Sequence, residues 1–318
     1  MKIPNIILPL FAIALSACGG PEEITVRTIS PAGAPTLAFY DQGKSPNFET
    51  NTTPSNVLAE FQTNYYNAIV FDSINALKSI KDNNLDFKLA KLITGGNFYL
   101  ASIDKEDDAM PTADDVVVSF GENLIPDLVY LKLCEFWEIV NVPFYVPSVS
   151  EALGVLKTGL YSGQPVDYVF IAQPALKIAM SDQAAATYGR VKVAKNIRSE
   201  WENCTGQIAI PQAGLFVRNS HYELNPEVFN NYVDEMVARI DVAIDDSAIA
   251  KAALDEFGTA QEQAAKFGFN SNIMLTIQTD ITNPNGFGLV RGTDSVDVNV
   301  FLETLNLDAF DDSFFLNL

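Results

Sequence analysis

Short apolar runs alternate with stretches of helical spacing along the first half of the chain. The runs at 68–71 and 87–93 are almost continuously apolar, as in strands that are covered on both faces. Between them, Ile74, Leu77 and Ile80 recur at the spacing of one helical face. Strands that alternate with helices over short links predict parallel α/β layers.

A second block repeats this pattern. Strands are expected at 116–118, 142–146, 167–171 and 191–193. Ser119 with Glu122 and Ser148 with Glu151 have the spacing of capping boxes, although Pro126 suits a first turn and shifts the first of these helix starts forward. Beyond residue 217 the pattern is mainly helical, with helix starts expected at Pro226, Thr259 and Asp294 or Ser295.

The N-terminus has the features of an export signal. Lys2 precedes an apolar stretch at 3–17, which is shorter than the roughly 20 residues of a membrane-spanning helix. The stretch ends in the sequence LSACG around Cys18, which resembles a bacterial lipobox and implies cleavage before a lipidated Cys18. We therefore expect a signal peptide at 1–17, a lipidated tether at 18–22 and an extracytoplasmic protein anchored to the membrane, either in the periplasm or on the outer face of the cell membrane. An ordinary signal with a chance cysteine is the alternative.

Charge and motif content restrict the class of protein. A formal net charge of −20 disfavours nucleic acid and anionic lipid as partners, although acidity that only keeps an exported protein soluble is the simpler explanation. The sequence has one histidine, His221, and lacks a G-x-S-x-G elbow, an H-E-x-x-H helix, a P-loop and a Cys/His cluster for zinc. We therefore expect no enzyme, no metal and no cofactor. Cys134 and Cys204 either pair or remain two free thiols.

Five short segments at strand ends and at a later extended run carry a family resemblance. They are SPAGAPT at 30–36, FDS at 71–73, TGGN at 94–97, SFGE at 119–122 and IPQAGLF at 210–216. Their order resembles the substrate-binding proteins of ABC importers. Within that group it is similar to the type II proteins for nitrate, sulfonates, taurine and thiamine-pyrimidine precursors.

The resemblance implies an α/β fold of the type II periplasmic-binding-protein class. Such a fold has two lobes, each a mainly parallel sheet flanked by helices, with the ligand cleft between them. Lobe 1 is expected at 23–102 plus 212–318, and lobe 2 at 103–211. The chain is expected to cross near Leu100 to Asp104 and to return near Pro211 to Phe216, where Pro211 and Gly214 are hinge candidates.

The candidate ligand residues lie at expected carboxyl ends of strands and at the return crossing. Open α/β sheets bind ligands outside these ends, helix starts offer free N–H groups, and small residues let a ligand approach the backbone. Each residue of the set is alternatively a turn or cap residue without a ligand. The ligand-binding set is Ser30, Gly33, Ala34, Pro35, Thr36, Tyr40, Asp72, Ser73, Thr94, Gly95, Gly96, Asn97, Ser119, Gly121, Glu122, Gln173 and Gln212.

The side chains of this set indicate a ligand chemistry. Asp72 and Glu122 can pair with a cationic or N–H-bearing group, and Lys and Arg are scarce in these segments. We therefore expect a neutral or cationic heteroaromatic solute, such as a vitamin precursor, that a monomer delivers to an ABC permease. A lipid-anchored hydrolase and a surface adhesion lipoprotein are the alternatives. The aromatic residues that can stack on a flat ligand, although the core is the simpler place for each, are Tyr40, Phe98, Tyr99 and Phe120.

Overall fold

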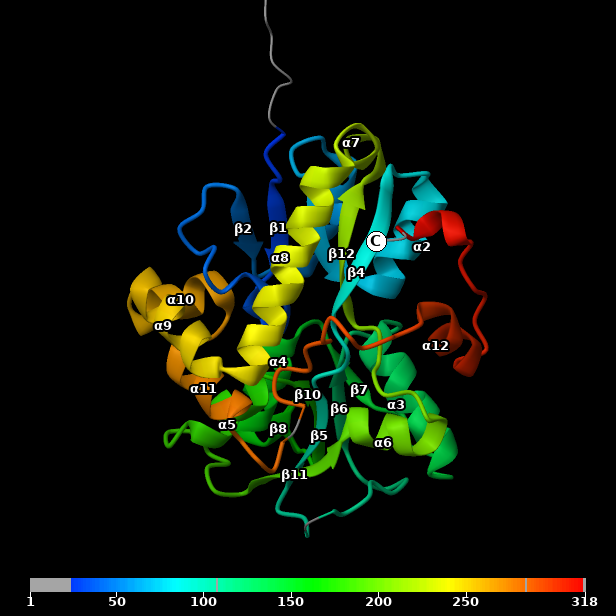
Figure 1. Cartoon of the computed structure of the whole chain (residues 1–318). Coiled ribbons are helices and arrows are strands. Elements are labelled where there is room, and N and C mark those ends of the chain that lie inside the picture. Colours follow the sequence, from blue (N-terminus) through cyan, green and yellow to red (C-terminus); the bar gives the residue numbers. More distant parts are fainter. Residues whose placement is uncertain (1–23, 107, 284, 317–318) are drawn as a thin grey trace, which may run out of the picture.

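The computed structural model describes residues 24–106, 108–283 and 285–316, which form two lobes built on two five-stranded sheets (Figure 1). The expected signal peptide, tether and lipidation site at Cys18 lie outside these residues. Within the described residues, none of the helices combines the length and apolar content that a bilayer span needs. Cys134 is buried, Cys204 is partly buried, and both are free thiols.

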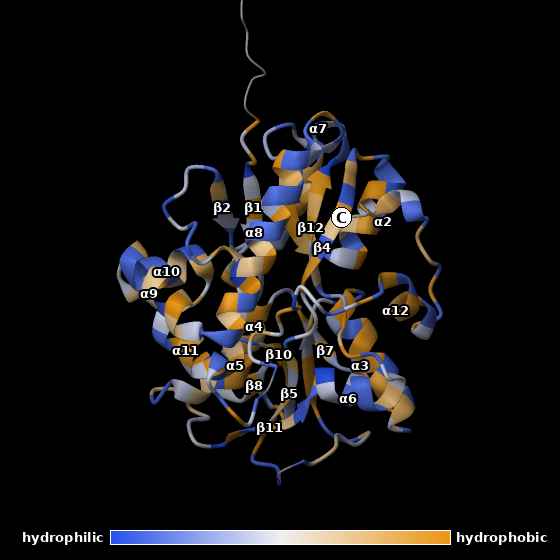
Figure 2. Ribbon diagram, in the orientation of Figure 1, coloured by the Kyte–Doolittle hydropathy of each residue, from blue (hydrophilic) through white to orange (hydrophobic). Residues whose placement is uncertain are grey.

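The sheet of lobe 1 contains one reversed strand. β12 runs antiparallel to both of its neighbours, whereas β1 pairs in parallel with β2 and β3. The central strands are apolar because helices cover both faces of the sheet (Figure 2). Across the sheet, the order is β2 (Phe48–Asn51), β1 (Thr28–Pro31), β3 (Ala68–Asp72), β12 (Ala213–Arg218) and β4 (Phe87–Thr94).

The sheet of lobe 2 has the same plan. β5 runs antiparallel to β10 and β11, and β6 pairs in parallel with β10 and β7. A short hairpin of β8 (Leu160–Tyr161) and β9 (Gln164–Pro165) lies outside the sheet. The order is β11 (Val191–Asn196), β5 (Phe98–Ile103), β10 (Tyr168–Ala172), β6 (Val117–Phe120) and β7 (Phe144–Val146). The expected class of two mainly parallel sheets flanked by helices is confirmed.

Helices surround both sheets. Lobe 1 contains η1 (Ala34–Phe39), α1 (Pro54–Ala59), η2 (Glu60–Gln62), α2 (Ser73–Asn83), α7 (Asn219–Leu224), α8 (Pro226–Asp245), α9 (Ser247–Phe257), α10 (Ala260–Phe267), α11 (Ser271–Gln278) and η3 (Asp312–Phe314). Lobe 2 contains α3 (Ile125–Phe136), α4 (Val149–Thr158), α5 (Ala175–Ser181) and α6 (Ile197–Thr205).

Some expected helix starts are confirmed and two are wrong. The helix expected from Asp294 or Ser295 begins only at Val298, because Asp297 caps it by accepting from the N–H groups of Asn299 and Val300. Thr259 and Glu262 form the expected capping box of α10, and Ser148 caps α4. The box expected at Ser119 and Glu122 does not form, because α3 begins only at Ile125 with a proline in its first turn. Proline fits that position, where no N–H is needed for a helical hydrogen bond.

The chain crosses between the lobes earlier than expected. β4 ends in lobe 1 at Thr94, and β5 already pairs with β10 and β11 of lobe 2 from Phe98 onward. The expected boundary at residue 102 and crossing near Leu100 to Asp104 therefore cut through β5. The physical reason is burial: every residue of β5 is buried in the middle of the lobe 2 sheet. The return precedes β12, which begins at Ala213.

One C-terminal helix connects the lobes by contact. α12 (Val298–Thr304), capped by Asp297, packs against α6 of lobe 2: the ring centroids of Phe301 and Trp201 lie 5.2 Å apart, and both side chains are buried. The chain then returns to lobe 1, where the N–H of Leu316 donates to the carbonyl of Leu89 at 2.9 Å. We call residues 298–316 the C-terminal strap.

Candidate ligand site between the lobes

The carboxyl ends of the parallel strands in both lobes face the junction between them. β4 ends where the chain leaves lobe 1, and β1 and β3 run in the same direction as β4. β5 starts where the chain enters lobe 2, so β10 and β6, which oppose β5, end at the junction (Figure 1). Open α/β sheets bind ligands at such ends.

Three residues of the expected set join the crossing segments to lobe 2. Asn97 Nδ2 donates to the carbonyl of Gln173 at 2.7 Å, and the N–H of Asn97 donates to Gln212 Oε1 at 3.2 Å. Asn97 is 2% exposed, and its Oδ1 has no hydrogen-bond partner. A buried amide oxygen without a partner is uncommon, so this atom is a candidate acceptor for a donor that enters the junction.

Ser73 and Thr94 join the return crossing to lobe 1. Ser73 Oγ donates to the carbonyl of Pro211 at 2.5 Å, and Thr94 Oγ1 accepts from the N–H of Ala213 at 3.1 Å. The N–H of Ile210 donates to the carbonyl of Gly95 at 2.9 Å, so the two crossing segments also bond directly to each other. These residues therefore tie the two crossing segments to each other and to lobe 1.

The loop after β1 packs against α10. The N–H of Gly33 and Thr36 Oγ1 both donate to the carbonyl of Phe267, at 2.8 and 2.9 Å. Gly268 follows with φ of +82°, and a Cβ there would lie 2.8 Å from the nitrogen of Gly33. A glycine is therefore required at 268 for this close approach.

The loop after β6 lies apart from the β1 loop. Glu122 is exposed, and Gly121 takes φ of +72° beside Leu124. Ser119 is buried, with Oγ donating to the carbonyl of Phe120 at 3.3 Å. This segment ends a strand at the junction but makes no hydrogen bond to the β1 loop among the described residues.

Asp72 is the carboxylate of the expected set that the protein desolvates. Its Oδ1 caps α2 by accepting from both the N–H and Nδ2 of Asn75, each at 2.9 Å. Surrounding protein raises the pKa of Asp72 to about 6 through desolvation, against the opposing effect of the two hydrogen bonds from Asn75. Part of the side chain remains accessible to water. The group can therefore change charge near neutral pH.

Most of the expected set is shielded from solvent. Tyr40 lies in the lobe 1 core, where burial raises the pKa of its phenol. Buried with it are Ser30, Ala34, Thr36, Ser73, Thr94, Gly95, Gly96, Asn97, Ser119, Gly121 and Gln173, whereas Gly33, Pro35, Asp72 and Gln212 are partly exposed. In this structure the set is therefore exposed mainly at Gly33, Pro35, Asp72, Glu122 and Gln212.

A cavity of about 290 Å³ lies between the lobes, beside the β1 loop. Its walls come from α5 of lobe 2 and from α10 and α11 of lobe 1. Another cavity of about 400 Å³ lies between β4 and the C-terminal strap. Neither of these two cavities is lined by a residue of the expected set. The lining of the interlobe cavity, which sequence reasoning missed, is Ile178, Ser181, Asp182, Ala264, Gly268, Phe269, Asn270 and Ile273.

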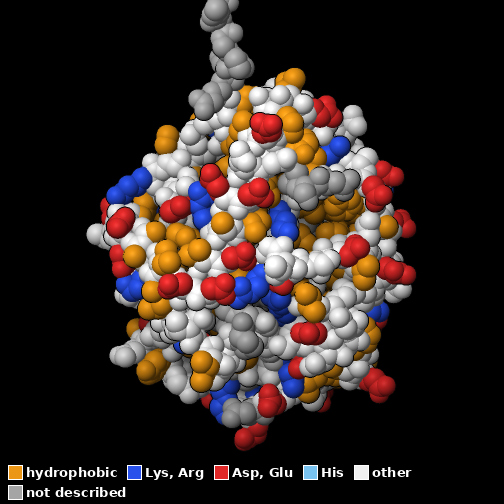
Figure 3. All heavy atoms as spheres, in the orientation of Figure 1, with side chains coloured by type: hydrophobic (Ala, Val, Ile, Leu, Met, Phe, Trp, Pro, Cys, Tyr) orange, Lys and Arg blue, Asp and Glu red, His pale blue; other side chains and the backbone are white. Residues whose placement is uncertain are grey.

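Sequence reasoning also missed a cation at the junction. Arg198, on α6, places Nη1 3.7 Å from the position that a Cβ would take at Gly95, and its Nε donates to the carbonyl of Ile208 at 2.8 Å. Burial lowers the pKa of this guanidinium. Figure 3 shows Lys and Arg side chains gathered near the level where the lobes meet. No motif marks Arg198, since it lies about 100 residues from Gly95 in sequence.

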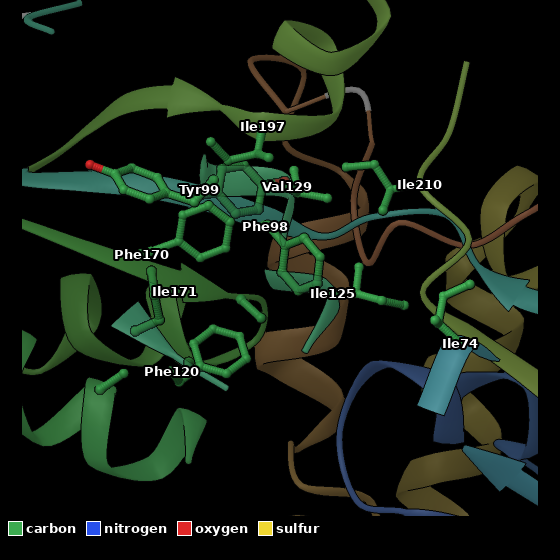
Figure 4. Packing of buried hydrophobic residues seen from close by; sticks show 14 of the residues in the cluster. Ile74, Phe98, Tyr99, Phe120, Ile125, Val129, Phe170, Ile171, Ile197 and Ile210 are labelled. Atoms are coloured by element: carbon green, nitrogen blue, oxygen red, sulfur yellow. The ribbon is translucent and has the colours of Figure 1, made fainter. Parts of the chain in front are cut away.

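Apolar packing is continuous through both lobes. Ile74 of lobe 1, Ile125 of lobe 2 and Ile210 of the return crossing belong to one buried cluster (Figure 4). Polar contacts add to it: Tyr99 OH donates to Asn283 Oδ1 at 2.6 Å, and Gln207 Nε2 donates to Thr304 Oγ1 at 2.6 Å. The lobes are therefore in contact in this structure.

Comparison with known proteins identifies the fold. No protein-family model and no curated protein matches the chain. Among solved structures, an ABC transporter protein from Parabacteroides distasonis has 14% identity, covers 92% of this chain and 99% of its own, and superposes with a TM-score of 0.60. The aliphatic sulphonate binding protein SsuA from Escherichia coli has 11% identity, 88% and 90% coverage and a TM-score of 0.62.

A further structure, the alkanesulfonate-binding protein SsuA from Xanthomonas axonopodis pv. citri bound to MOPS, has 11% identity, 88% and 89% coverage and a TM-score of 0.56. At these identities the similarity concerns the fold. The chain has the fold of periplasmic binding proteins, as the sequence resemblance implied.

Proposed function

We propose that this protein is the solute-binding component of an ABC importer, which captures a small organic molecule between its lobes and delivers it to a permease. The observation that carries the proposal is the arrangement of the sheets, whose strand ends face one another across a junction crossed by two adjacent chain segments. The solved structures with this fold include an ABC transporter protein and two proteins that bind sulfonates.

The mechanism follows from this arrangement. A solute that contacts both lobes binds the closed form better than the open form and shifts the population toward it. About 5.5 kcal/mol of differential binding converts a rare closed form into the dominant one. Asn97, Gln173 and Gln212 fix the two crossing segments against lobe 2, so the movement is expected on the lobe 1 side of this network.

We favour a neutral or cationic heteroaromatic solute. Asp72 supplies a desolvated carboxylate at a strand end of lobe 1, and Asn97 Oδ1 supplies an unused acceptor. Both groups accept hydrogen bonds when Asp72 is ionised, which suits an amino-substituted ring.

One observation favours a sulfonate as the second candidate. Arg198 places a partly buried guanidinium against Gly95 at the junction, and two of the solved structures with this fold are sulfonate-binding proteins. A guanidinium binds an oxyanion through paired hydrogen bonds.

Calorimetry with two variants separates these candidates. The solutes are a 4-aminopyrimidine, taurine, MOPS and nitrate, and the variants are Asp72→Asn and Arg198→Gln. A cationic heteroaromatic ligand loses about 10- to 100-fold in affinity with Asp72→Asn and little with Arg198→Gln, because a charged hydrogen bond is lost only in the first. A sulfonate shows the reverse pattern. A protein that binds none of these solutes and carries no small molecule by native mass spectrometry contradicts the transport proposal.

We also propose that Cys18 is acylated and anchors the protein outside the cytoplasm. Mass spectrometry of the N-terminal peptide from membranes tests this directly. The expected peptide starts at Cys18 with a diacylglyceryl group, and a free thiol at Cys18 contradicts it.

A further inference from the structure

The described chain starts at one end of lobe 1, opposite the junction (Figure 1). Residues 24–27 lead into β1, and hydrogen bonds tie them to their neighbours. Asn67 Nδ2 donates to the carbonyl of Thr25 at 3.0 Å, and the N–H of Arg218 donates to the carbonyl of Asn67 at 3.0 Å. α7 follows Arg218 directly. We call the surface of 24–27, 63–67 and α7 the lobe 1 pole.

Two large apolar side chains are exposed on the lobe 1 pole. Leu224, at the end of α7, is 75% exposed, and Tyr65 is 53% exposed. The Arg27 guanidinium lies 5.1 Å from the centroid of the Tyr65 ring. Tyrosines and cations of this kind are enriched where proteins meet the headgroup region of a membrane.

Carboxylates on the same pole restrict the type of lipid. Asp86 and Glu223 are exposed, and they accept hydrogen bonds from Ser220 and Asn219 of α7. Together with the net charge of −20, they repel anionic headgroups and leave neutral, zwitterionic lipid as the compatible surface.

Chain length restricts where the pole can lie. Six residue steps separate Cys18 from Ile24 (24 − 18), and a fully extended chain covers roughly 20 Å over that number. A compact chain of about 300 residues is about 50 Å across. A lipid on Cys18 therefore holds the lobe 1 pole near the bilayer, while the far end of lobe 2 is free to stand much further out.

We infer that the lobe 1 pole is the surface through which the free protein rests on zwitterionic lipid, with Tyr65 and Leu224 against the headgroups. This inference rests on the proposed function, because it requires the lipid on Cys18. The two lobes then stand one above the other on the membrane.

Environment-sensitive labels test this orientation. Leu224→Cys and Val142→Cys are a matched pair, because both native side chains are 75% exposed and Val142 precedes β7 at the end of lobe 2 away from the junction. Each is made with Cys204→Ser, labelled with a maleimide dye, and compared between acylated protein in phosphatidylcholine vesicles and an unacylated Cys18→Ser form. The dye at 224 is expected to shift to the blue on vesicles and to lose access to an aqueous quencher by severalfold, whereas the dye at 142 is unchanged.

The outcomes distinguish the two proposals. Equal behaviour of both dyes on protein whose Cys18 lipid is verified by mass spectrometry overturns the orientation and leaves the anchoring intact. An unmodified Cys18 overturns both. Solute binding by the Cys18→Ser form in solution tests transport separately.

Discussion

Asp72 combines two roles at the scale of a single residue. Its Oδ1 caps α2 at a strand end that faces the junction, and the proposed function gives the same carboxylate a second role as a ligand of the solute. Desolvation raises the pKa of Asp72 to about 6. The charge of this residue therefore depends on pH in a range where most aspartates are fully ionised.

The pH dependence of stability is the first prediction. Between the unfolded pKa of about 3.9 and the folded value of about 6, the folded state binds more protons, so the contribution of Asp72 to the free energy of unfolding falls as pH rises through this window. The fall is about 3 kcal/mol at most. Asp72→Asn keeps the cap and removes the fall. Urea denaturation at pH 4 to 8 measures the difference from wild type, with the α12 cap variant Asp297→Asn as the control. Parallel curves for wild type and Asp72→Asn contradict the prediction.

At the scale of elements, two glycines end helices in the same way but in different surroundings. Gly206 after α6 and Gly268 after α10 have φ of +74° and +82°. A Cβ at Gly206 meets nothing within 4 Å, whereas one at Gly268 meets the backbone of Gly33. The end of α10 and the β1 loop are therefore joined by backbone contact.

The second prediction uses this pair. Gly206→Ala is expected to lower the free energy of unfolding by about 1–2 kcal/mol, the cost of a left-handed backbone. Gly268→Ala adds a clash with Gly33 and is expected to cost about 3 kcal/mol or more. Chemical denaturation measures both. Equal losses for the two variants would show that the β1 loop moves away from the added methyl group at no cost in free energy.

Sequence patterns predicted the elements whose burial or capping depends on residues that lie close together in the sequence. The apolar runs of β3 and β4 and the capping box of α10 are of this kind. The assignment of β5 to a lobe was wrong, because an apolar run does not say which sheet covers it. The placement of Arg198 against Gly95 was missed, because only the packing of α6 brings them together. The expected ligand contacts stay a prediction. Among the residues of the expected set, Ser73, Thr94 and Asn97 form hydrogen bonds that fix the crossing segments.

At the scale of the whole molecule, the lobes are joined by more than the two crossings. The C-terminal strap leaves lobe 1, places Phe301 on Trp201 of lobe 2 and returns to β4. Separation of the lobes must shear this contact or carry the strap with lobe 2.

Phe301→Ala is expected to lower the free energy of unfolding by about 3–5 kcal/mol, because both rings are fully buried. Thermal or urea unfolding tests this, and Val300→Ala, at an exposed position of the same helix, is the control. A loss no larger than that of the control would contradict it.

The contact between Trp201 and Phe301 also provides an intrinsic fluorescence probe. The sequence has two tryptophans, and Trp137→Phe leaves Trp201, whose indole faces Phe301 and donates to Gln207 Oε1 at 3.2 Å, as the sole indole emitter. A movement of the lobes that shears the contact changes the polarity and quenching around that indole, whereas a movement that carries the strap with lobe 2 leaves them unchanged. Stopped-flow emission of this unlabelled variant therefore shows whether the proposed lobe motion shears the contact between Trp201 and Phe301, and at what rate.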